Sequence, residues 1–143
     1  MLIPISWLSD YIKTDDLKTI NQTLLQGGLE IEEVLNYKGK NKVLKVEVTP
    51  NRGDWASIIG VARELSALSN HNLNKKRVKI TADSNLSTAD NFALKIEAQK
   101  ACRKYIAYQV DGISVKESDS KIKTRLDQLA EKSVNNIVDA TNY

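Results

Sequence analysis

One loop holds the residues of this chain that are the strongest candidates for a functional site. It reads TPNRGD, residues 49–54, and it joins a strand-like segment to an amphipathic, helix-like one. Pro50 ends the extended segment, and Asp54 suits the N-cap of a helix over residues 55–69. Local geometry leaves Arg52 unexplained, and the aromatic Trp55 follows it closely. These two side chains are therefore candidates for contact with a phosphate group or a partner protein.

An internal ion pair is the competing interpretation of Arg52. Glu47, Asp54 and Glu64 are the acidic residues that this loop and its flanking elements would bring near. Internal pairs of this kind are common on protein surfaces. The sequence therefore favours an internal salt bridge of Arg52 over an external ligand.

Nucleophilic and metal chemistry have few candidate residues in this chain. Cys102 and His71 are the single cysteine and the single histidine, and they are far apart in sequence. Arg103 and Lys104 would activate Cys102 if the thiol were exposed, but an inert thiol is the favoured interpretation. The Gly27-Gly28 pair lacks the spacing of a phosphate-binding loop and suits a helix C-cap. The sequence thus predicts no catalytic, cofactor-binding or metal-binding residue.

Composition places the chain among soluble globular proteins. Its 143 residues are 41% hydrophobic and 27% charged, and no apolar run approaches the roughly 20 residues that span a bilayer. The apolar start lacks a preceding basic region, and one cysteine favours a reducing compartment. We therefore expect a cytoplasmic protein with no membrane partner.

Charge is distributed unevenly along the chain. Residues 1–70 have a net charge of −1, whereas residues 71–143 have a net charge of +4. A short basic run, Lys75, Lys76 and Arg77, lies in a polar linker-like stretch at the junction. A polyanion could contact this run, although a solvated surface is the more common explanation of so small an excess.

Periodicity predicts an α+β fold class. Helical spacing and capping residues indicate helices that begin at Trp7 with Ser6 as cap, at Leu17 after Asp15 or Asp16, at Trp55, and near Ser118 or Asp119. Alternation predicts a β-hairpin over residues 29–37 and 43–49, with a slip in the alternation at Glu33. It also predicts extended segments over residues 92–98 and 102–115. The last segment, residues 134–143, is mixed.

A change in composition after residue 73 predicts two domains. Residues 1–73 form a small domain of helices and a β-hairpin, and residues 74–143 form part of a mixed α/β domain. The second part offers little core of its own, and an apolar pattern is still in progress at Tyr143. We therefore expect the second domain to be truncated and the chain to be a piece of something longer.

Three blocks of sequence resemble the N-terminal part of the bacterial phenylalanine–tRNA ligase beta subunits. The first is ISWLSDYI with LLQGGLEIEEV, and the second is VEVTPNRGDWASIIGVARELSAL, with its Thr-Pro-Asn-Arg-x-Asp loop before a Gly-[Val/Ile]-Ala-Arg-Glu helix. The third is CRKYIAYQVDGISV with the ending NNIVDATNY. Together they cover nearly all of the chain, and the second and third are specific.

One departure from the family concerns the first two blocks. Most members carry an OB-fold tRNA-binding domain of about a hundred residues or more between them, whereas only NYKGKNK separates them here. The resemblance therefore implies that this insert is missing near residues 37–43. It also implies that residues 74–143 are the leading part of an editing-type domain.

The resemblance implies a role without chemistry of its own. The family's enzyme attaches phenylalanine to its tRNA with ATP and magnesium, its alpha subunit performs that reaction, and its beta subunit contributes structure, tRNA contacts and editing. We expect this chain to hold no cofactor, to have the alpha subunit and tRNA as partners, and to support the ligase in protein synthesis. Arg52, Trp55, Lys75, Lys76 and Arg77 are its candidate contacts with tRNA or another subunit.

Two alternatives remain open at this point. The chain could be a stand-alone RNA-binding module derived from the same family, or a protein-interaction module with an exposed apolar patch near Trp7, Trp55 or the C-terminal edge. A homodimer formed through an open strand edge is a further candidate assembly.

Overall fold

The computed structural model describes residues 1–13, 16–39, 41–75 and 93–143. These residues belong to two compact units, Met1–Lys76 with Val115–Tyr143, and Arg77–Ser114. Residues 115–143 thus group with the N-terminal residues. The domain boundary that the change in composition after residue 73 predicted stays a prediction.

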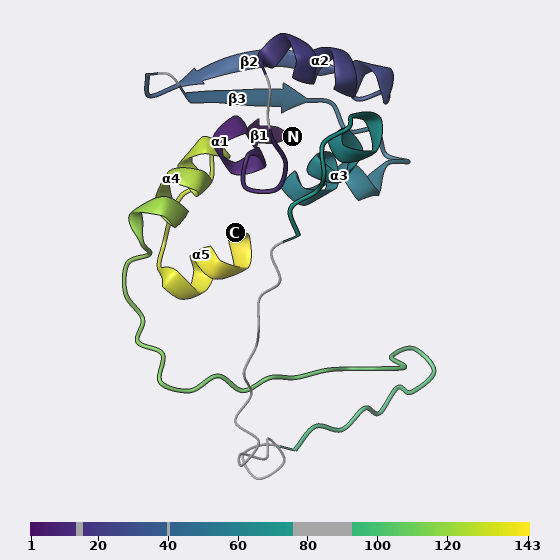
Figure 1. The fold of residues 1–143 in the computed structure, drawn as a ribbon. Coiled ribbons are helices and arrows are strands. Elements are labelled where there is room, and N and C mark those ends of the chain that lie inside the picture. The colour runs from purple at the N-terminus through teal and green to yellow at the C-terminus, as the bar shows by residue number, and fades with distance from the viewer. Residues whose placement is uncertain (14–15, 40, 76–92) are drawn as a thin grey trace. The chain divides into compact units, whose positions relative to one another are not determined.

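A three-stranded antiparallel sheet and five helices make up the regular structure of the described residues, as Figure 1 shows. The strands are β1 (Leu2–Pro4), β2 (Ile31–Tyr37) and β3 (Asn41–Val46), in the order β1-β3-β2. The helices are α1 (Ile5–Leu8), α2 (Leu17–Gln26), α3 (Ile58–Leu68), α4 (Ser120–Gln128) and α5 (Asn136–Asn142). The predicted α+β class is confirmed.

The predicted β-hairpin is present. Strands β2 and β3 pair from Ile31 opposite Val46 to Tyr37 opposite Asn41, and the register shifts between Ile31 and Glu33, where the alternation slips. Lys38 and Gly39 both have positive φ, the backbone region that tight hairpin turns use. Lys38 and Gly39 therefore have backbone conformations that suit a tight turn.

The core lies where α2 and α3 pack with the sheet and with α1. Its fully buried side chains come from every one of these elements: Ile3, Leu8, Leu24, Leu29, Leu44, Val46, Trp55, Val61 and Ala62. The helix predicted from Trp55 as amphipathic buries most of its apolar side, because Val61, Ala62 and Leu65 face this core, whereas Leu68 is 38% exposed. The core fixes the position of the TPNRGD loop.

Helix caps were partly predictable. The side chain of Asp16 accepts a hydrogen bond from the Thr19 amide at 3.0 Å, and that of Asp119 accepts one from Ile122 at 2.9 Å, as expected. The alternative cap, Asp15, lies outside the described residues. At the first helix the prediction was wrong. α1 begins at Ile5 after Pro4, whose ring presets the φ of the cap position, and β1 precedes it.

The expected cap of the third helix was also wrong. Residues Gly53–Trp55 form a separate 3₁₀ turn, and α3 begins later, with Ser57 as its cap. The Ser57 hydroxyl accepts a hydrogen bond from the Gly60 amide at 3.0 Å. Asp54 is not the cap because it lies inside the 3₁₀ turn, before the cap position of α3, and its carboxylate pairs with Arg52 instead.

The strands expected over residues 92–98 and 102–115 are not observed. The structure describes residues 93–115 of these ranges, and none of them is in a strand. A strand forms only when a neighbour pairs with its backbone groups, and alternation alone supplies no such neighbour. The final segment, predicted as mixed, contains helix α5.

Gly60 gives a testable expectation for this fold. A Cβ at this position would lie 2.1 Å from the carbonyl oxygen of Asp54, so the backbone would have to move. Gly60→Ala should therefore lower the free energy of unfolding by about 1–3 kcal/mol, although alanine usually stabilises a helix. Urea unfolding measures this. Gly53→Ala is the matched control, since nothing lies within 4 Å of its Cβ position; an equal loss there would contradict the explanation.

Candidate functional site

The TPNRGD loop is closed by Arg52, which bonds to residues of its own chain. The guanidinium donates to both carboxylate oxygens of Asp54, at 3.0 and 2.9 Å, and to Glu64 at 3.0 Å. It also lies over the ring of Trp55, 3.4 Å from the centroid. These hydrogen bonds from Arg52 hold the pKa of Asp54 below its usual value. The predicted internal salt bridge of Arg52 is confirmed.

Trp55 is an interior residue of this loop. Its side chain is buried in the core cluster, and its indole N–H donates to Glu64 Oε2 at 3.0 Å. Glu64, on α3, thus accepts from both the indole and the guanidinium. We call Arg52, Asp54, Trp55 and Glu64 the arginine clasp. Each polar group of the clasp has a partner within it, so the clasp primarily joins the loop to α3.

A substitution at Arg52 separates a structural role from a binding role. Arg52→Gln should lower the free energy of unfolding by about 1–2 kcal/mol, the sum of half-exposed ion pairs and a cation–π contact. Its effect on tRNA affinity should be no larger than that of Arg63→Gln, an exposed arginine on α3. Thermal unfolding and filter binding of tRNA measure the two effects. A tenfold loss of tRNA affinity without a loss of stability would show that Arg52 acts on a ligand.

The structure describes only one residue of the predicted basic run. Lys75 is exposed, whereas Lys76 and Arg77 lie outside the described residues. Contact of tRNA or another subunit with Lys75, Lys76, Arg77, Arg52 or Trp55 stays a prediction.

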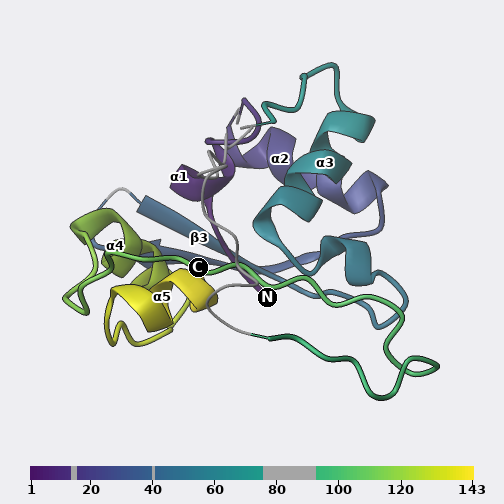
Figure 2. The same ribbon diagram turned by 90° about the horizontal axis from the view of Figure 1, so that it is seen from below.

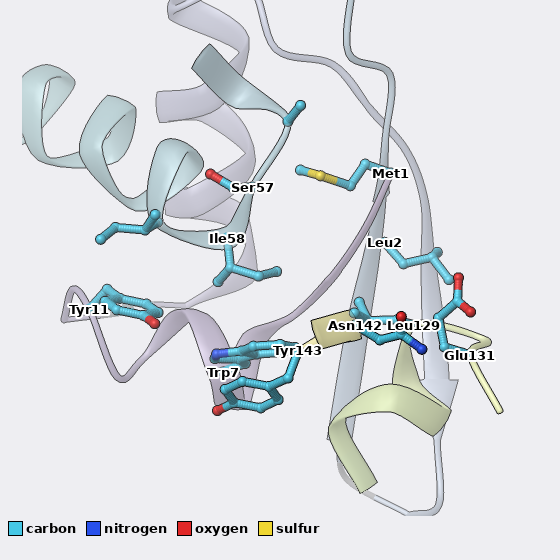
Figure 3. Close-up of a pocket in the computed structure, with 12 residues that line it drawn as sticks. Met1, Leu2, Trp7, Tyr11, Ser57, Ile58, Leu129, Glu131, Asn142 and Tyr143 are labelled. Carbon is cyan, nitrogen blue, oxygen red and sulfur yellow. The ribbon is translucent and has the colours of Figure 1, made fainter. Parts of the chain in front are cut away.

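A hollow of about 500 Å³ lies between the N-terminus, the start of α3 and the α5 end. Figure 3 shows the stacked rings of Trp7 and Tyr143 on one side of it and Met1 on another. Apolar and aromatic side chains dominate its lining, which includes Met1, Leu2, Trp7, Tyr11, Ile58, Ile59, Leu129 and Tyr143. Its volume is that of a typical ligand pocket. Such a lining can receive an apolar group and offers little to bind a charged one.

One wall of the hollow depends on a buried cation. Arg125 of α4 donates to Asp10 at 2.6 Å and to the hydroxyl of Tyr143. Its guanidinium lies 4.9 Å from the centroid of the Trp7 ring, and Trp7 stacks on Tyr143 with centroids 4.5 Å apart. We call Asp10, Trp7, Arg125 and Tyr143 the Arg125 cluster. It attaches residues 115–143 to the N-terminal residues.

The α4 and α5 helices, which lie side by side in Figure 1 and Figure 2, are joined by a buried carboxylate. Asp139 is fully buried and accepts from the hydroxyls of Ser118 and Ser133, each at 2.5 Å, and from the Val134 amide at 2.8 Å. These three hydrogen bonds hold the pKa of Asp139 below its usual value, with Ser118 contributing most. The Asp of the NNIVDATNY ending therefore has a structural role.

The two asparagines at the start of that ending also have structural roles. The Asn135 side chain caps α5, accepting from the amides of Ile137 and Val138 at 3.0 Å each. Asn136 accepts from the Lys116 amide at 2.9 Å and donates its own amide to the Lys116 carbonyl at 2.8 Å. The sequence analysis described this segment only as mixed, so it predicted neither the Asn135 cap nor the partners at residues 116 and 118.

Comparison with known proteins decides the family. No family model and no solved structure matches the chain. The phenylalanine–tRNA ligase beta subunit of Thermotoga maritima is 43% identical over 116 residues, which are 80% of this chain and 14% of that protein. The protein of the same name in Aquifex aeolicus is 38% identical over 116 residues. The Rhodopirellula baltica one is 33% identical over the whole chain. The chain belongs to the phenylalanine–tRNA ligase beta-subunit family.

This chain matches only a small part of each relative. It spans 14% of the Thermotoga and Aquifex relatives and 21% of the Rhodopirellula relative, so most of each relative has no counterpart here. The Rhodopirellula match runs over 148 positions, five more than the 143 residues of the chain. That alignment therefore contains no insertion as large as a domain.

Candidate metal sites and membrane-spanning helices are both absent from the described residues. No group of three or more histidine, cysteine, aspartate and glutamate side chains gathers there in a way that could hold a metal ion. None of the helices in the described ranges has both the length and the apolar character that crossing a bilayer requires.

Proposed function

We propose that this chain is a non-catalytic part of a phenylalanine–tRNA ligase beta subunit. It supports the ATP- and magnesium-dependent attachment of phenylalanine to tRNA in the cytoplasm, through folded structure, tRNA contact and subunit assembly. The observation that carries the proposal is identity of 33–43% to beta subunits over 80–100% of the chain. ATP, magnesium and the reaction belong to the whole enzyme in this proposal.

The geometry supports a role in assembly. The polar groups of the arginine clasp bind one another, and those of Asp139 join two helices, so both serve the fold. By contrast, the hollow beside Trp7 has an apolar lining and partly exposed apolar side chains on its rim, namely Met1, Ile59 and Tyr143. Apolar hollows with exposed rims are typical of docking surfaces. This hollow is the surface where we place contact with the alpha subunit.

Binding of the alpha subunit tests the proposal. The chain is mixed with the alpha subunit from the same organism, and complex formation is followed by sedimentation velocity. Ile59→Asp, on the rim of the hollow, should weaken the complex at least tenfold. Leu25→Asp is the matched control, because Leu25 is exposed on α2 and does not line the hollow. Absence of a complex, or equal weakening by both variants, would contradict the assembly role.

The same mixture distinguishes the RNA-binding alternative. If the chain binds tRNA without the alpha subunit, and the affinity falls steeply between 50 and 200 mM salt, basic contacts to phosphate carry that binding. Lys75→Ala should then reduce the salt dependence by about one released counterion. Binding of tRNA alone, with no affinity for the alpha subunit, would favour a stand-alone RNA-binding module.

A further inference from the structure

Three lysines from separate parts of the chain surround one hollow of about 310 Å³. Lys38 lies in the turn between β2 and β3, Lys123 on α4, and Lys132 in the loop that follows α4. Figure 1 and Figure 2 both show α4 beside the turn end of the hairpin. We call this hollow, with its three lysines, the lysine pocket.

The acidic residues of the lysine pocket do not cancel its positive charge. Asp127 accepts a hydrogen bond from the hydroxyl of Tyr37 and forms an ion pair with Lys38 at 2.7 Å. Glu131 is the second acid of the lining. Three lysines and two acids leave a formal charge of +1. The pocket therefore suits an anion that carries a single negative charge, as one phosphodiester does.

Lys123 and Lys132 are the cations that a ligand can engage. Lys132 is exposed and forms no ion pair with any residue that the structure describes. Lys123 pairs with Glu117 at 2.6 Å, but the side chain of that glutamate is 87% exposed, and exposed pairs contribute little free energy. A phosphate oxygen can therefore replace Glu117 at small cost. Lys38, by contrast, holds the hairpin turn against Asp127 of α4.

The other polar groups of the pocket suit a ribose. Thr124 is exposed beside Lys123, and its hydroxyl can donate to a phosphate oxygen. Ser133 donates its proton to Asp139 at 2.5 Å, so its oxygen remains an acceptor. Glu131 is an acceptor as well. Acceptors beside a cationic pair can receive the 2′-hydroxyl that distinguishes RNA from DNA and from a free phosphate.

We propose that the lysine pocket binds one ribose-phosphate unit of a tRNA backbone. Lys123, Lys132 and Thr124 contact the phosphate, and Glu131 accepts from the 2′-hydroxyl. Contacts of this kind position an RNA without reading its bases. The inference rests on the proposed tRNA contact of this chain, and it places that contact away from the basic run at residues 75–77.

Lysine acetylation of the complete ligase, with alpha and beta subunits together, tests the pocket in its full assembly. Mass spectrometry follows the labelling of Lys132 and of Lys18, an exposed lysine of α2 outside the pocket. We expect tRNA to slow the labelling of Lys132 severalfold and to leave Lys18 unchanged. Inorganic phosphate in place of tRNA should protect neither. An unreactive Lys132 in the ligase without tRNA would overturn the proposal, because the pocket would then be covered. Protection by inorganic phosphate alone would also overturn it.

A substitution measures the contact itself. Lys132→Gln removes a cation that makes no ion pair with the described residues, so the fold should be unchanged. The tRNA affinity of the complete ligase should fall severalfold at low salt, and the slope of log affinity against log salt should become shallower by about one. Lys18→Gln is the matched control and should change neither quantity. Equal effects of the two variants would overturn the proposal.

These outcomes are separate from those that test the proposed function. Binding of the alpha subunit is measured without tRNA, so its absence contradicts the assembly role whatever Lys132 does. A ligase that binds tRNA equally well with Lys132→Gln and with the wild-type residue overturns the pocket and leaves the proposed function in place.

Discussion

Replacement of Asp139 by alanine should lower the midpoint of thermal unfolding by roughly 10 °C. The buried carboxylate accepts three hydrogen bonds, from Ser118, Ser133 and the Val134 amide, and the substitution leaves these donors without an acceptor. Hydrogen bonds to charged groups are among the stronger ones, and small domains are sensitive to their loss. Glu131→Ala, an exposed acid near the same helices, should change the midpoint by less than about 2 °C. Calorimetry of the two variants measures the difference.

The same carboxylate predicts a pH dependence of stability. The folded-state pKa of Asp139 is lowered, so it lies below its unfolded value of about 3.9. The stabilisation is therefore complete at neutral pH and is lost as the pH falls below the unfolded pKa and through the folded one. Asp139→Asn should lack this loss, so its stability should fall less than that of the wild type between about pH 5 and 2. Parallel curves for the two proteins would show that another group controls the acid limb.

Replacement of Arg125 by methionine should detach residues 115–143 from the N-terminal residues. Methionine keeps an apolar stem but leaves Asp10, whose side chain is 25% exposed, without the cation that lies 2.6 Å away. The expected loss of unfolding free energy is about 2–3 kcal/mol, less than for a fully buried pair. Trp7 emission should move to longer wavelength, because Tyr143 no longer covers the indole ring. Urea unfolding followed by fluorescence measures both changes.

Lys121→Met is the control for this prediction. Lys121 lies 3.8 Å from the same carboxylate of Asp10 but is exposed, so its removal should cost under about 0.5 kcal/mol. A double-mutant cycle of Arg125→Met with Asp10→Asn should give a coupling energy of about 1 kcal/mol or more. Equal losses for the two cation variants, or a coupling energy near zero, would contradict the role assigned to Arg125.

Features whose causes are local could be predicted from the sequence. Asp16 and Asp119 cap helices because a carboxylate three residues before a free amide needs no distant partner. The hairpin was predictable for the same reason, since alternation and a glycine turn specify it. At Asp54 this reasoning failed, because a 3₁₀ turn takes up residues 53–55 and α3 begins only after Ser57, which becomes the cap.

Features made by distant residues could not be predicted. The strand β1 has three residues, too few for a visible alternation, and exists because β3 pairs with it. The hollow beside Trp7 joins Met1, Ile58 and Tyr143, which no sequence spacing relates. The internal salt bridge of Arg52 was predicted, with Glu64 among its candidate partners, but the burial of Trp55 beneath the guanidinium was not.

The Arg125 cluster joins residues that the ribosome synthesises at widely separated times. Asp10 and Arg125 are 115 residues apart. At about 5–20 residues per second, a ribosome needs roughly 6–23 s to synthesise that interval. Trp7 therefore emerges well before Tyr143, the residue that covers its ring. During this interval the indole ring of Trp7 lacks the aromatic side chain that covers it in the folded chain, and the Arg125 cluster can form only after Tyr143 has been synthesised.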